Sequence, residues 1–186
     1  MAKILVVFAS FDGQAARIAR RIAHALEHDG HTVAVRRAVD AQAVRDLPRQ
    51  DAVVVGGAVR YGRHARALEA FAREHAATIA AKPNAFFSVS LSAGGPGARP
   101  VNAARQIEEF CRRAGWRPRE VAAFAGALPY SRYNFFLRIV MRLIVGAAGG
   151  DTDTSRDYEY TDWDAVERFA ASFSRRLARA PETLAA

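Results

Sequence analysis

The residues best suited to chemistry lie between Ser10 and Ala15, in a short polar stretch that contains one glycine. A continuous apolar run, residues 4–9, precedes it, and apolar residues at helical spacing follow it. A loop that ends a strand and opens a helix leaves backbone N–H groups without partners, and the helix dipole adds positive charge there. Gly13 permits the positive φ that such a cradle needs. The pattern favours phosphate binding, although an ordinary turn with Asp12 capping the helix also fits.

The loop matches neither of two common nucleotide-binding patterns. It lacks both the G-x-G-x-x-G spacing of dinucleotide-binding folds and the G-x-x-x-x-G-K-S/T spacing of the P-loop. It resembles instead the phosphate loop of flavodoxins, Ser/Thr-x-Thr/Asp-Gly-x-Thr/Ala, which holds the phosphate of FMN. The contacts that this resemblance implies are Ser10, Phe11, Asp12, Gly13, Gln14 and Ala15.

Further candidate contacts follow three other apolar runs, residues 51–57, 84–91 and 121–127. A flavin ring is flat, so aromatic and apolar walls suit it. We therefore expect Tyr61 and Tyr130 to contact the ring, although two half-exposed tyrosines would give the same pattern. The predicted contacts outside the phosphate loop are Ala58, Arg60, Tyr61, Gly62, Ser90, Leu91, Ser92 and Tyr130.

Basic side chains accompany these exits. Guanidinium groups pair with carboxylates, so Arg60, Arg63 and Arg138 are candidates for binding an acidic substrate. Solvated surface arginine is the alternative interpretation. His64 is a candidate for proton transfer, but nothing in its local sequence fixes that role, so the general base stays open.

The sequence gives little support for a metal site. His24 and His28 have the i, i+4 spacing of metal ligands, and His31 is close by, but no carboxylate or further ligand accompanies them, so we predict no metal. The one cysteine, Cys111, excludes a disulfide within the chain and an all-cysteine iron–sulfur cluster. A reducing cytosol fits this cysteine usage, and Cys111 itself is expected in the core.

Strand and helix patterns alternate along the chain and position these loops. Apolar runs at residues 4–9, 51–57, 84–91 and 121–127 predict strands buried on both faces, and residues 31–37 predict an edge strand. Helical spacing between them predicts right-handed crossovers and hence a parallel sheet. The predicted fold is a flavodoxin-like doubly wound α/β domain over residues 1–186, with five strands in the order 2-1-3-4-5. Ligands bind such sheets at the switch point, where the candidate loops meet.

A helical insertion, residues 128–150, separates the fifth strand from a last helix at about 162–177. We expect Ser131 to cap a helix that ends at Gly149 and Gly150. Its apolar arc is wide and is flanked by Arg138, but the segment is too short and too charged to span a bilayer. This pattern is typical of a helix in a membrane interface, here residues 131–146, and also of a helix buried in a dimer or in an enlarged core.

The formal net charge of +8 favours an anionic partner: membrane headgroups, a carboxylate-bearing substrate or nucleic acid. Arginine far exceeds lysine, however, so a general preference for arginine would also explain the charge. Met1 to Lys3 leads straight into an apolar strand, so we expect no signal peptide. The expected location is the cytoplasm, at the inner face of the cell membrane.

Taken in order, several segments resemble the menaquinone-dependent protoporphyrinogen oxidases, a flavodoxin-like bacterial family. The segments that carry this resemblance are Ser10–Gln14, Gly56–Gly62, Phe86–Val89, Ala125–Tyr130, Gly149–Thr154 and Tyr160–Trp163. It covers nearly the whole chain. One departure is Ala15, which stands where the family often has threonine, so one hydroxyl donor to the phosphate is missing.

The resemblance implies an enzyme that uses FMN to oxidise protoporphyrinogen IX to protoporphyrin IX in haem synthesis. Its electrons would pass to menaquinone or ubiquinone in the membrane, with no nucleic-acid partner. Three alternatives stay open: a flavodoxin-type electron carrier, an NAD(P)H:quinone reductase and a cofactor-free interaction module on the same fold. Which quinone reacts and whether the chain forms a homo-oligomer are left open.

Overall fold

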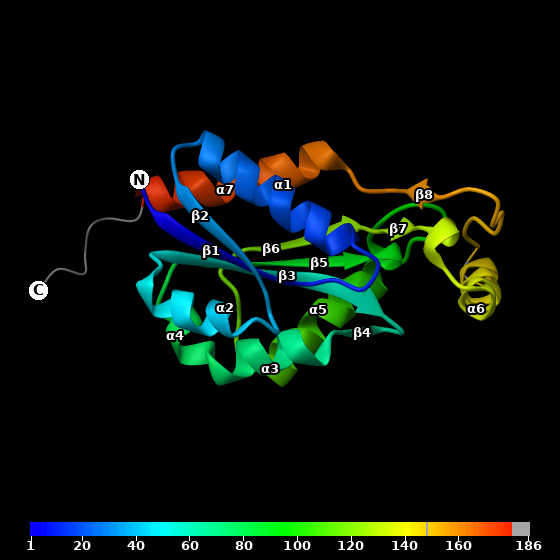
Figure 1. The fold of residues 1–186 in the computed structure, drawn as a ribbon, viewed down its shortest axis with the longest axis horizontal. Coiled ribbons are helices and arrows are strands. Elements are labelled where there is room, and N and C mark those ends of the chain that lie inside the picture. The colour runs from blue at the N-terminus through cyan, green and yellow to red at the C-terminus, as the bar shows by residue number, and fades with distance from the viewer. Residues whose placement is uncertain (148, 180–186) are drawn as a thin grey trace, which may run out of the picture.

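A computed structural model of the chain shows a parallel β-sheet with helices on both faces (Figure 1). It describes residues 1–147 and 149–179, without the side chains of Leu137 and Ile144. The strands of the main sheet are β1 (Lys3–Ala9), β2 (Thr32–Arg37), β3 (Ala52–Arg60), β4 (Arg63–His64), β5 (Asn84–Ser90) and β6 (Val121–Ala125). The parallel strands lie in the order β2-β1-β3-β5-β6. Because β4 is only a short strand paired with β3, the fourth and fifth predicted strands are β5 and β6, and the predicted fold and order 2-1-3-4-5 are confirmed.

The continuous apolar runs form the middle of the sheet because helices cover both of their faces. Helices α1 (Gln14–His28) and α7 (Trp163–Arg179) pack on one side, against alternate residues of β1 such as Ile4 and Val6. Leu5 and Val7 point to the other side. That side is covered by α2 (Ala41–Asp46), η1 (Leu47–Arg49), α3 (Arg66–Glu74), α4 (Ala76–Ala80) and α5 (Pro100–Ala114).

The insertion packs around a small core of its own beyond the carboxyl ends of the strands (Figure 1). Leu128, Tyr130, Tyr133 and Val145 are buried there. The connecting elements are η2 (Leu91–Ala93), β7 (Ala127–Leu128), η3 (Tyr130–Arg132), α6 (Phe135–Ala147) and β8 (Tyr158–Glu159). Strands β7 and β8 pair antiparallel, so the chain that leaves the main sheet at β7 returns beside it at β8, after the insertion.

Local expectations differ from the structure in three places. The helix predicted at residues 65–80 is two helices, α3 and α4, separated at His75. Ser131 does not cap α6, which begins at Phe135; it lies in η3 and donates through its backbone N–H and its hydroxyl to Asp157. The exit of β3 is not a loop, because β3 and β4 form a short antiparallel hairpin there.

Candidate functional site

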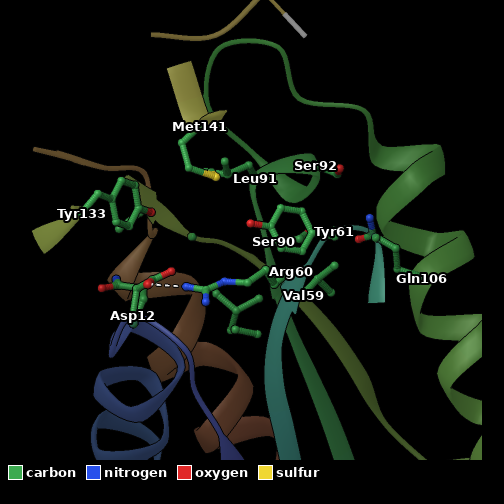
Figure 2. Close-up of a pocket in the computed structure, with 16 residues that line it drawn as sticks. Asp12, Val59, Arg60, Tyr61, Ser90, Leu91, Ser92, Gln106, Tyr133 and Met141 are labelled. Carbon is green, nitrogen blue, oxygen red and sulfur yellow. Dashed lines mark hydrogen bonds and ion pairs between the residues drawn. The ribbon is translucent and has the colours of Figure 1, made fainter. Parts of the chain in front are cut away.

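A cavity opens at the carboxyl edge of the sheet, where the exits of β1, β3 and β5 meet (Figure 2). Asp12 and Tyr133 lie on one side of this cavity and Gln106 lies on the other. The lining residues that the sequence predicted as contacts are Asp12, Gln14, Ala58, Arg60, Tyr61, Gly62, Ser90, Leu91 and Ser92. The lining residues that it did not predict are Val59, Val89, Gln106, Gly126, Ala127, Tyr133 and Met141.

The loop before α1 has the open form that an anion needs. Gly13 stands at φ 96°, in the left-handed region, and its N–H donates to the Ser10 hydroxyl at 3.0 Å. No side chain caps α1, and its first turn contains no acidic residue. The expectation that Asp12 caps this helix is therefore wrong. Free N–H groups and the helix dipole are left facing the space in front of Gln14.

Asp12 instead forms an ion pair with Arg60 from the exit of β3, at 2.5 Å, along the floor of the cavity (Figure 2). The Arg60 guanidinium also lies over the ring of Phe11, 4.6 Å from its centroid. Both partners of the ion pair keep about a third of their side-chain surface in solvent, so the pair contributes little to stability. Arg60 is therefore held near the opening without being locked in place.

Tyr61 stands at the tip of the β3–β4 hairpin with φ 51°, the only positive φ of a non-glycine residue in the described part of the chain. This conformation costs a non-glycine residue about 1 kcal/mol or more, and it recurs at functional sites. Its side chain is 69 % exposed and lines the cavity. The hairpin thus presents an aromatic ring at the opening.

Two polar atoms inside the cavity lack partners among the described residues. The Ser90 hydroxyl and the Gln106 side-chain carbonyl are both buried and make no hydrogen bond there. Leaving a buried polar group unpaired costs about 1–3 kcal/mol. Hydrogen bonds to a polar group of a bound molecule would remove this cost, so Ser90 and Gln106 mark where such a group would lie.

Apolar side chains form the rest of the wall. Val59, Val89 and Leu91 come from the sheet edge, and Met141 reaches in from α6 (Figure 2). Burial, followed by the nearby charge of Asp12, raises the pKa of Tyr133 far above its usual value. The Tyr133 hydroxyl therefore stays protonated and is available as a hydrogen-bond donor.

Some predicted site residues lie elsewhere. Tyr130 does not line the cavity, because its ring is fully buried in the core of the insertion and its O–H donates to the Asp151 carbonyl at 2.9 Å. Tyr133 takes its place on the cavity wall. Ser10, Phe11, Gly13 and Ala15 belong to the loop around the start of α1 rather than to the cavity lining.

His64 is a core residue and not a group open to a substrate. It is buried among Phe86 and Phe110, and its Nε2 lies 2.9 Å from the Ser88 hydroxyl. Burial lowers the pKa of His64 to about 4. The structure therefore contradicts the candidate role of His64 in proton transfer to a bound molecule.

The candidate substrate arginines separate as well. Arg63 makes two hydrogen bonds to the buried Glu69 carboxylate and does not line the cavity. Arg138 lies on α6, where it donates to the Tyr133 carbonyl at 3.4 Å. Of the three predicted arginines, Arg60 alone borders the cavity.

One missed residue left a signal in the sequence. Gln106 lies on the face of α5 that also carries the buried Ala103 and Phe110, at a spacing of three and four residues. A polar residue at a core-facing position indicates a polar partner. By contrast, Met141 and Tyr133 reach the cavity only because the insertion folds back over the sheet edge, and no local pattern predicts that.

Metal binding and membrane crossing receive no support from the described residues. No cluster of three or more histidine, cysteine, aspartate or glutamate side chains there is arranged to hold a metal ion. None of the helices within residues 1–147 and 149–179 is both long and apolar enough to cross a bilayer.

Comparison with known proteins agrees with the fold. A family model described as a flavodoxin domain matches residues 5–155. A protoporphyrinogen IX dehydrogenase (quinone) of Escherichia coli K12 is 36 % identical over 171 residues, covering 90 % of this chain and 92 % of the relative. A protein of the same name from Leishmania major is 33 % identical over 177 residues, covering 92 % of this chain and 74 % of the relative.

Solved structures of flavodoxins share the fold. A flavodoxin from the domain Archaea superposes with a TM-score of 0.53 at 18 % identity, covering 95 % of this chain and 99 % of the other. Oxidised flavodoxin 2 from Bacillus cereus gives a TM-score of 0.57 at 19 % identity, covering 94 % and 99 %. At this level of identity the superpositions support the fold alone.

Proposed function

The chain belongs to the flavodoxin-domain family that includes the protoporphyrinogen IX dehydrogenases, and we propose that it uses FMN to oxidise protoporphyrinogen IX with a membrane quinone as electron acceptor. The observation that carries this proposal is the cavity at the sheet edge. One of its ends adjoins the uncapped start of α1, and two unpaired buried polar atoms lie inside it.

The residues present fit FMN. The N–H groups at the start of α1 and the turn at Gly13 would hold its phosphate. Apolar side chains and Tyr61 would enclose the flat ring, and Ser90 and Gln106 would complete hydrogen bonds to its polar edge. This set lacks the hydroxyl donor that Ala15 cannot supply, but it retains the backbone cradle.

Bound FMN would supply the two-electron redox chemistry, and the protein supplies position and surroundings. Conversion of protoporphyrinogen IX to protoporphyrin IX removes six electrons and six protons. Three quinone molecules take them up and leave as quinols, so the reaction balances without another reactant. The chain's own contribution is to hold flat apolar rings against Val59, Leu91 and Met141 and to limit water at that wall.

An acidic tetrapyrrole would meet basic side chains at the opening. Arg60 is the best placed of the predicted substrate arginines, because it borders the cavity and its ion pair with Asp12 is partly solvated. Arg138 is a second candidate, on the helix that contributes Met141 to the wall. Arg63 is not part of this proposal, because the buried Glu69 carboxylate engages its guanidinium.

The quinone would approach along α6. Phe135, Phe136 and Leu143 each expose more than two thirds of their surface on this helix, and Met141 of the same helix lines the cavity. A helix with exposed large apolar side chains and flanking arginines suits the interface of a bilayer. We therefore propose peripheral binding to the inner face of the cell membrane, within the segment predicted at residues 131–146.

The test is anaerobic incubation of the purified protein with FMN, protoporphyrinogen IX and a menaquinone analogue, followed by porphyrin fluorescence. We expect porphyrin to form well above the rate without protein and to require the quinone. Formation at the protein-free rate would overturn the proposed function. Rapid electron exchange with a redox protein would then favour the carrier, and quinone-dependent oxidation of NADH would favour the reductase.

A further inference from the structure

An arginine of the insertion lies against the loop that precedes α1. The Nη1 atom of Arg132, at the end of η3, is 3.3 Å from the Asp12 carbonyl oxygen. The same atom is the nearest neighbour, at 3.4 Å, of the position that a side chain on Gly13 would take. Asp12 lies 120 positions before Arg132 in the sequence, and the fold brings the two residues together.

Arg132 differs from the other cations around this loop because it forms no ion pair with a described residue, although its charge helps to lower the pKa of Asp157 from beyond ion-pair distance. Arg60 is paired with Asp12, and Arg17 is paired with Glu159 at 2.8 Å. No carboxylate of the described residues lies within ion-pair distance of Arg132, and its guanidinium donates instead to the neutral carbonyl of Asp12. Its guanidinium therefore keeps donors free for another acceptor.

The acidic groups near Arg132 are largely occupied. Arg132 and Asp157 both line a second pocket, next to Asp12, and the two carboxylate oxygens of Asp157 accept the N–H and the O–H of Ser131 at 2.8 and 2.7 Å. These bonds hold the pKa of Asp157 below its usual value, so its carboxylate stays charged while both of its oxygens already accept hydrogen bonds from Ser131. Glu159, which lines the same pocket, accepts hydrogen bonds from Arg17 and Gln14.

The turn that carries Arg132 is fixed on both sides. Tyr130 and Tyr133, which flank it, are both buried in the core of the insertion. The bonds from Ser131 to Asp157 tie the same turn to the segment before β8. The exposed guanidinium is thus delivered to the start of α1 by a well-anchored backbone, at little cost in ordering.

We infer that Arg132 binds the phosphate of the cofactor and completes a cradle that the loop alone leaves incomplete. This inference rests on the proposed use of FMN. The backbone N–H groups at the start of α1 would supply neutral donors, and Arg132 supplies the charge-assisted bonds that a phosphate dianion favours. It compensates for Ala15, which has no hydroxyl. The contact also links the insertion to the cofactor, so binding of FMN holds the insertion over the sheet edge.

The experiment compares FMN with riboflavin, which carries the same ring without the phosphate. Quenching of flavin fluorescence measures both affinities for the wild-type protein, Arg132→Ala, Arg132→Lys and the control Arg20→Ala. Arg20 is an exposed arginine further along α1, so its loss makes the same change in net charge. Gln106→Leu probes the ring end of the cavity.

We expect Arg132→Ala to weaken FMN at least tenfold and to leave riboflavin within twofold. Lysine should restore part of the loss, and Arg20→Ala should change neither affinity by more than twofold. Gln106→Leu should weaken FMN and riboflavin by the same factor. Thermal melts of the apoproteins check that the exposed Arg132 can be replaced without loss of folding.

Two results would overturn the inference while leaving the use of FMN intact. One is an Arg132→Ala protein that binds FMN as tightly as the wild type does. The other is an equal loss of FMN and riboflavin, which would make Arg132 a structural residue. A wild-type protein that binds neither flavin would instead overturn the proposed function, and this inference with it.

Discussion

Two residues of one short hairpin, Tyr61 and His64, have opposite environments. Pairing of β3 with β4 sets Val59 opposite His64, which turns the imidazole into the core while Tyr61 stays at the exposed tip. The sequence places both residues on the same strand exit, so both were candidates for the site. Their separation depends on the hairpin, whose turn requires a left-handed tyrosine that no sequence pattern indicates.

The buried imidazole makes stability depend on pH. His64 has a pKa of about 4 in the folded protein and an ordinary value of 6.5 when unfolded. Between these two pH values the unfolded chain binds a proton at His64 that the folded protein does not bind. The contribution of neutral His64 to the free energy of unfolding is therefore full above pH 6.5 and falls as the pH drops toward 4. From pH 7.5 to pH 5 the loss amounts to about 2 kcal/mol.

His64→Leu should remove this contribution. Urea unfolding at pH 7.5 and pH 5 should show a free energy of unfolding that falls less in the variant than in the wild type, by about 2 kcal/mol. The variant also leaves the Ser88 hydroxyl without its partner, but that cost is the same at both pH values and cancels in the comparison. Equal pH dependence of the two proteins would mean that His64 titrates normally and is accessible to solvent.

At the scale of elements, the sequence predicted the sheet better than the site. The order of the parallel strands followed from apolar runs and crossover rules, since buried parallel strands have few alternatives. The break at His75 and the start of α6 at Phe135 were not predicted, because ends of helices depend on packing as much as on local signals. The loops of the cavity were predicted, but the wall supplied by the insertion was not.

The insertion helix offers a direct test of the proposed membrane contact. Ile139 on α6 is 44 % exposed, beside Val140 and Leu143, so an aspartate there would place a charge in the apolar surface without opening the core. We expect Ile139→Asp to weaken binding to lipid vesicles about tenfold and to slow quinone-linked turnover. FMN affinity should stay within twofold of the wild type.

Val101→Asp is the matched control, because Val101 is 81 % exposed on α5 and the substitution adds the same charge. Vesicle co-sedimentation and flavin titration measure the two effects separately. If Ile139→Asp lowered FMN affinity and turnover by the same factor, α6 would be a structural part of the cavity and not a membrane contact.

At the scale of the whole molecule, the net charge of +8 should act together with α6. Many arginines form ion pairs, such as Arg17 with Glu159 and Arg63 with Glu69. Arg142, by contrast, is exposed on α6, the helix proposed to contact the membrane. A basic residue close to an anionic bilayer contributes about 1 kcal/mol to binding, and the effect fades within about 10 Å at 0.1 M salt.

Position should therefore matter more than total charge. Arg142→Gln on α6 is expected to weaken binding to vesicles containing anionic phosphatidylglycerol about fivefold, and Arg112→Gln, an exposed arginine of α5, to weaken it less than twofold. Raising sodium chloride from 50 to 300 mM should remove most of the difference, because salt screens the local attraction. Equal losses for the two variants would assign the attraction to the net charge of the molecule. Binding that neither salt nor anionic lipid changes would assign it to the apolar side chains of α6 alone.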